Sequence, residues 1–166
     1  MHIQQLKSQI RFLLVLFILA LVLSGATAMP AETELKFFLQ HFPSLQPISD
    51  LFARVFAAIH ITNQNYPYLM YGYDWLAFGH FVIAVVFFGP IKDPVKNIWV
   101  IEFGMIACVM VLPFALIVGG FRGLPIWWRF IDCSFGIIGF IPLWIIRNKI
   151  LQLQELYDDE KLNLFF

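Results

Sequence analysis

The run NIWVIEFGMIACVMVLPFALIVG, residues 97–119, is long enough to cross the hydrocarbon core of a membrane as one helix, and its single charge is Glu102. Two further apolar runs, at residues 73–89 and 126–146, flank it with only short polar turns between them. Because each run has the length and hydrophobicity of a membrane span, the three together indicate a polytopic membrane protein.

The composition of the whole chain supports this class. Of its 166 residues, 60% are apolar and only 13% are charged, and the mean hydropathy is +0.78. These values lie far from those of soluble globular proteins. The formal net charge is zero, so we expect no nucleic-acid partner. We predict one membrane domain over residues 1–166.

The N-terminal segment has the layout of a signal sequence. Lys7 and Arg11 precede an apolar run, and the small residues 26–28 follow it. The same layout fits a signal anchor, because residues 12–29 reach the lower length limit of a span. We expect the segment to be retained, which makes four spans with both termini on one side. Cleavage of residues 1–28 would leave three.

The one long polar region, residues 30–70, separates the first span from the second. Residues 33–42 and 49–61 alternate apolar and polar positions with helical spacing, which predicts two amphipathic helices on the membrane surface. His41 and His60 lie in these helices without a second ligand at helical spacing. We interpret both as interfacial polar residues rather than metal or haem ligands. The expected fold is therefore an all-α, four-transmembrane-helix bundle with interfacial helices between spans 1 and 2.

Lysine and arginine are unequally distributed across the expected spans, with seven on one side and four on the other. Since positive residues accumulate on the cytoplasmic side, we place both termini, the turn 90–96 and the tail 147–166 in the cytoplasm of an inner (plasma) membrane. The seven are Lys7, Arg11, Lys92, Lys96, Arg147, Lys149 and Lys161, and the four are Lys36, Arg54, Arg122 and Arg129.

The few ionisable residues inside the spans are the candidates for function, because a charge at the centre of a membrane helix costs about 2.5–3.5 kcal/mol. The helical rise places His80 and Glu102 in the cytoplasmic half, where they are expected to share a layer. Asp132 lies on the same helix face as Gly136 and Gly139, which indicates that it points into the bundle.

A second polar group is expected at the outer mouth of the bundle. It contains Asp74, Arg122 and Arg129, and the spacing of Arg129 and Asp132 allows them to pair within one helix. Each polar group also has a structural interpretation. His80 can act as a hydrogen-bonded pin between helices, and Arg129 with Asp132 can form an interfacial ion pair.

Two functions fit these residues. The first, which we favour, is a non-enzymatic structural or accessory subunit that binds the lipid bilayer and a partner membrane protein, or forms a homo-oligomer. The second is a proton-coupled transporter or redox accessory subunit with His80, Glu102 and Asp132 as a proton relay or ligand site. Cys108 and Cys133 are interpreted as packing residues rather than a disulfide framework or a metal site. No catalytic residue is assigned, and the sequence does not identify a cofactor.

Overall fold

The computed structural model describes residues 2–163 and the side chains of residues 3–160, so the side chain of Lys161 and the end of the tail at 147–166 lie outside the described part. The chain is 88% helix, and the described residues contain no strand. Within the described residues, four helices are long and apolar enough to cross a membrane. The prediction of an all-helical chain with four helices of the length and hydrophobicity of a membrane span is confirmed. The four segments are Ile3–Ala28, Pro67–Lys92, Ile98–Phe121 and Ile126–Glu160.

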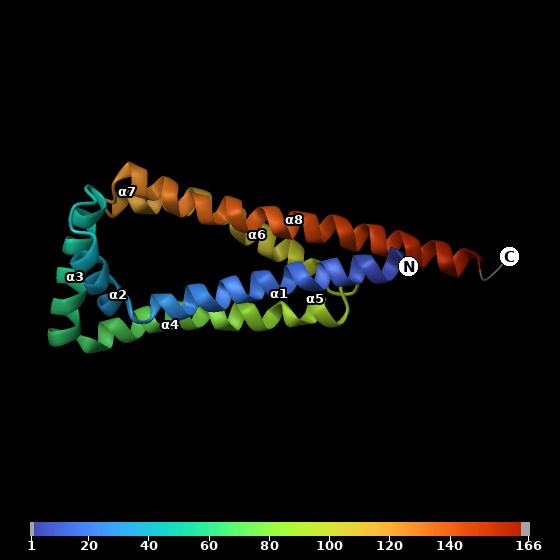
Figure 1. Ribbon diagram of the computed structural model, residues 1–166, viewed down its shortest axis with the longest axis horizontal. Coiled ribbons are helices and arrows are strands. Elements are labelled where there is room, and N and C mark those ends of the chain that lie inside the picture. The colour runs from blue at the N-terminus through green and yellow to red at the C-terminus, as the bar shows by residue number, and fades with distance from the viewer. Residues whose placement is uncertain (1, 164–166) are drawn as a thin grey trace. The chain divides into compact units, whose positions relative to one another are not determined.

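The helices are numbered in chain order, and Figure 1 labels α1 to α8. They are α1 (His2–Ala28), α2 (Ala31–His41), α3 (Ile48–Asn65), α4 (Pro67–Val86), α5 (Phe88–Lys92), α6 (Ile98–Pro113), the π-helical turn η1 (Phe114–Val118), α7 (Gly119–Phe121) and α8 (Ile126–Asn163). Helix α4 begins at Pro67 rather than at the expected residue 73. Proline suits the first helical position because its missing N–H has no partner there.

Helix α8 continues far beyond the expected end of the last span at residue 146. The extension keeps an apolar face, since Ile150 and Leu153 are fully buried. The first part of the expected tail is therefore a continuation of α8, and it packs against the rest of unit 1. Helix α6 passes into the π-helical turn η1 after Pro113. Proline cannot donate the helical hydrogen bond, so the ladder shifts at that point.

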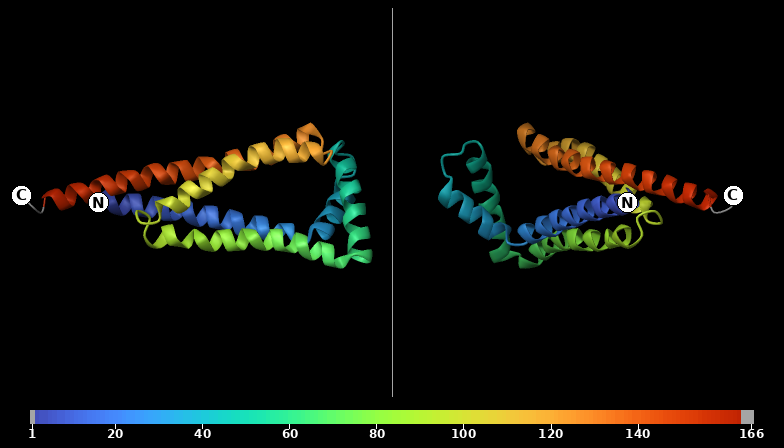
Figure 2. Two further views of the ribbon diagram at one scale, coloured as in Figure 1. Left: turned by 180° about the vertical axis from the view of Figure 1, so that it is seen from behind. Right: turned by 45° about the vertical axis from the view of Figure 1, so that its right-hand side comes forward.

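The chain divides into two compact units. Unit 1 comprises residues 1–18 and 86–166. Its core follows a helical repeat, because Leu6, Ile10 and Leu14 on α1 are spaced by four and all are buried. Both views of Figure 2 show α6 running alongside α8. The residues of α8 that are fully buried in this core are Leu143, Ile146, Ile150 and Leu153.

Unit 2 comprises residues 19–85. The two amphipathic helices expected between the first two spans are present as α2 and α3, and they pack against each other. The ring centroids of Phe38 and Phe52 lie 4.8 Å apart across this contact. The end of α1 packs on α4 at Gly25, where a Cβ would lie 2.8 Å from the carbonyl oxygen of Ala77. Small residues therefore bring these two helices close together.

Candidate functional site

Glu102 forms an ion pair with Arg147, and this contact joins α6 to α8. Arg147 Nε donates to Glu102 Oε1 at 2.9 Å, and both side chains are half-buried. The partners are 45 residues apart. The pairing was not predicted from the sequence, although the positions of the two residues along their helices indicate it. An antiparallel hairpin brings the start of one span beside the end of the next, which is where these residues lie.

An apolar groove begins at this ion pair and follows the contact between α6 and α8. Its volume is about 440 Å³. Apart from Glu102 and Arg147, every residue that lines it is apolar. The apolar lining consists of Met105, Ile106, Val109 and Met110 from α6 and Phe140 from α8. The groove thus combines a hydrocarbon-like wall with one charged end.

His80 lies on the face of α4 that contacts α1. Its ring Nδ1 donates to the carbonyl oxygen of Leu76 at 3.1 Å, within its own helix. A Cβ added at Gly25 would lie 3.0 Å from His80 Cβ, so the two helices meet at this point. His80 belongs to unit 2 and Glu102 to unit 1. That His80 and Glu102 lie at the same depth in the membrane stays a prediction.

The outer-mouth residues have separate surroundings. Arg129 Nε donates to the carbonyl oxygen of Leu124 at 2.9 Å, and its guanidinium covers Gly120. Among the described side chains, no ion pair joins Arg129 to Asp132. The guanidinium group of Arg129 instead binds the turn before α8. Asp132 is half-buried, and Arg122 and Asp74 are exposed.

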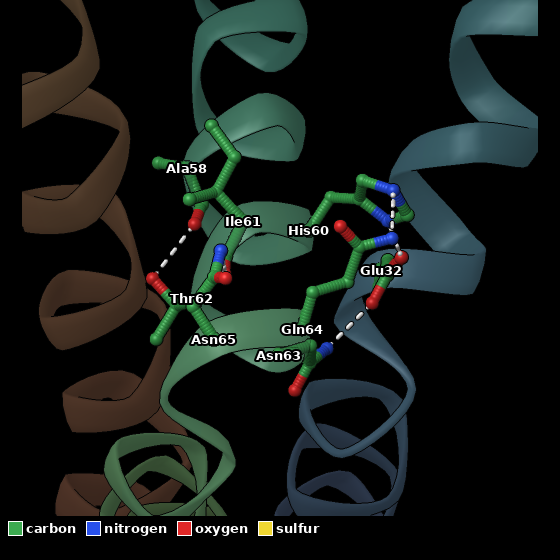
Figure 3. A network of polar contacts seen from close by, with 8 residues as sticks. All are labelled: Glu32, Ala58, His60, Ile61, Thr62, Asn63, Gln64 and Asn65. Carbon is green, nitrogen blue, oxygen red and sulfur yellow. Dashed lines mark hydrogen bonds and ion pairs between the residues drawn. The ribbon is translucent and has the colours of Figure 1, made fainter.

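Figure 3 shows a polar network between α2 and α3 that was not predicted from the sequence. His60 Nδ1 lies 2.6 Å from Glu32 Oε1, and Asn63 Nδ2 donates to the other carboxylate oxygen. Gln64 Nε2 donates to His60 Nε2 at 3.0 Å, which assigns the ring proton to Nδ1. The spacing of His60 and Asn63 on one helix face was the available signal.

This network acts on the charge of Glu32. The hydrogen bond from His60 holds the pKa of the Glu32 carboxyl below its usual range, and the hydrogen bond from Asn63 adds to the effect. Both contacts favour the ionised carboxylate, which accepts them. The charged form therefore links the start of α2 to the end of α3.

Within the described part of the chain, no three His, Cys, Asp or Glu side chains lie where they could hold a metal ion. Cys108 and Cys133 are free thiols. Cys108 lies at the contact of α6 with α8, since its sulfur would be 3.0 Å from a Cβ at Gly139. No known protein family, curated protein or solved structure matches the chain.

Proposed function

We propose that this chain is a non-enzymatic membrane protein of four spans, a helical bundle in an inner (plasma) membrane, that binds a lipid or a partner membrane complex. The apolar groove between α6 and α8 carries the proposal. A lipid acyl chain or an apolar helix from a partner matches walls of methionine, isoleucine and phenylalanine. The Glu102–Arg147 pair at the end of the groove supplies polar contacts for a headgroup or for a polar residue of the partner.

The hydrogen bonds of the polar residues support a structural role over a relay. Glu102 is held by Arg147, and Nδ1 of His80 is held by Leu76. In a membrane, such contacts satisfy groups that would otherwise be costly to bury. A proton-coupled transporter or redox subunit, the alternative, would need Glu102 to leave its arginine partner during each cycle. We therefore favour binding over transport.

Filling the groove tests the proposal. In Val109→Trp, an indole occupies the space of a lipid or partner, because Val109 lines the groove and is 52% exposed. The matched control is Ile138→Trp, on α8 but outside the groove lining, with 65% exposure. The measurement is native mass spectrometry of each protein after mild detergent extraction.

We expect wild-type protein and Ile138→Trp to retain a bound lipid or protein that Val109→Trp loses. Circular dichroism checks that both variants keep their helix content. If Val109→Trp retains the same lipids and proteins as the wild type, the groove is not the binding site and the proposal fails.

A further inference from the structure

A second cavity lies in unit 1, away from the residues that line the groove. Its volume is about 270 Å³. Three helices and one turn contribute to it: α1, α5, α8 and the residues after α5. The lining residues that carry charge are Lys7, Arg11, Lys92 and Asp93. Three of them are basic and one is acidic, so the lining carries a formal net charge of +2.

The three cations of this cavity have no acidic partner among the described side chains. Two other basic residues of unit 1, Arg147 and Lys149, do have partners. Arg147 pairs with Glu102, and Lys149 Nζ donates to Gln9 at 2.7 Å. Like charges around one cavity repel one another, which raises the electrostatic free energy. An anion bound between them lowers it. The cavity is thus positively charged and uncompensated.

Asp93, the one acidic residue of the lining, is already committed to Lys96. Its carboxylate lies 3.3 Å from Lys96 Nζ and accepts the backbone N–H of Lys96 at 3.2 Å. That backbone hydrogen bond lowers the pKa of the Asp93 carboxyl. The lysine compensates the ionised Asp93, which leaves the three cations of the cavity available to another anion.

The walls of the cavity are held in place by the fold. Ile10 and Pro90 are buried beneath it, and Pro94 restricts the turn that follows α5. Lys7 Nζ lies 5.3 Å from the centroid of the Tyr157 ring, a cation–π contact that orients its ammonium group. Because this contact restricts Lys7, ordering its side chain on an anion costs less entropy.

We propose that this cavity binds a phosphate group, carried either by an anionic lipid headgroup or by a soluble phosphate compound. Arginine forms paired hydrogen bonds with phosphate oxygens, and lysine adds point charge. In the proposed topology the cavity faces the cytoplasm, the side on which basic pockets between membrane helices bind anionic lipids. The lipid source rests on the proposed membrane location, whereas the soluble source does not.

The test uses the full-length protein, stripped of lipid in an uncharged detergent. Binding is measured for phosphatidylglycerol, phosphatidylcholine and inorganic phosphate. The variant Arg11→Gln with Lys92→Gln removes two cations from the cavity. The matched control, Lys36→Gln with Arg54→Gln, removes the same two charges from α2 and α3. Lys92→Gln alone serves as a milder second variant.

We expect the wild type and the control to bind a phosphate probe about 30-fold more tightly than the double variant, with about fivefold for Lys92→Gln. If the double variant loses affinity for phosphatidylglycerol alone, the phosphate group comes from a lipid headgroup. If it loses affinity for inorganic phosphate, the phosphate group comes from a soluble compound. Phosphatidylcholine is expected to bind weakly to all four proteins. If the wild type binds no probe, or if the control loses as much affinity as the double variant, the proposal is overturned. The groove between α6 and α8 is unchanged in these variants, so the two proposals fail separately.

Discussion

Gly136 sets the distance between α6 and α8 through the absence of a side chain. A Cβ at this position would lie 2.5 Å from the carbonyl oxygen of Cys108 and 3.3 Å from Val111 Cβ. The spacing of Gly136 from Asp132 predicts that both lie on the inward face of one helix, but spacing leaves open which helix that face meets. The structure identifies α6 as the neighbour of Gly136.

At this scale we predict that Gly136→Ala destabilises the protein by about 1–3 kcal/mol, because the new methyl group displaces the backbone of α6. The measurement is thermal unfolding in detergent, followed by circular dichroism. The control is Gly79→Ala on α4, where no atom lies within 4 Å of the added Cβ. There, alanine is expected to stabilise the helix by about 0.5–1 kcal/mol. Equal melting temperatures for the two variants would contradict the account of Gly136.

Among the helices, α2 and α3 form a pair of packed elements. The sequence predicted both amphipathic helices from their spacing, and the structure contains them. Their mutual contact depends on Phe38 against Phe52 and on the carboxylate of Glu32. Neither contact follows from periodicity, because each joins residues on different helices.

We predict that acid loosens this helix pair. The pKa of Glu32 is lower in the folded chain than in the unfolded one, since His60 donates to the ionised carboxylate. The folded chain therefore binds fewer protons, and the stabilisation is complete above the usual carboxyl range. It is lost as the pH falls through the folded-state pKa.

Hydrogen exchange of the α2 and α3 amides measures this effect, with rates corrected for the intrinsic pH dependence. Protection in the wild type is expected to fall at acidic pH. In Glu32→Gln the protection should be lower at neutral pH and nearly independent of pH. Glu34→Gln, an exposed change on the same helix, should follow the wild type. A Glu34→Gln profile as flat as that of Glu32→Gln would refute the role of Glu32.

At the scale of the whole molecule, the distribution of positive charge predicts the orientation. Because seven of the eleven lysine and arginine residues gather on one side, we expect both termini in the cytoplasm. A fluorescent protein fused after residue 166 should fold and fluoresce there. Alkaline phosphatase inserted at residues 42–47, between α2 and α3, should be active outside. The opposite pair of results would reverse the topology.

The sequence by itself determined the helical class, the four apolar helices and the amphipathic pair between the first two of them. These properties depend on length, hydrophobicity and local spacing, which each segment carries on its own. Only the tertiary structure decided which side chains meet. Glu102 meets Arg147, Glu32 meets His60, and Lys92 joins Lys7 and Arg11 only because packing brings separate helices together. Their register depends on how small residues and turns align neighbouring helices, and that alignment is a property of the packed chain.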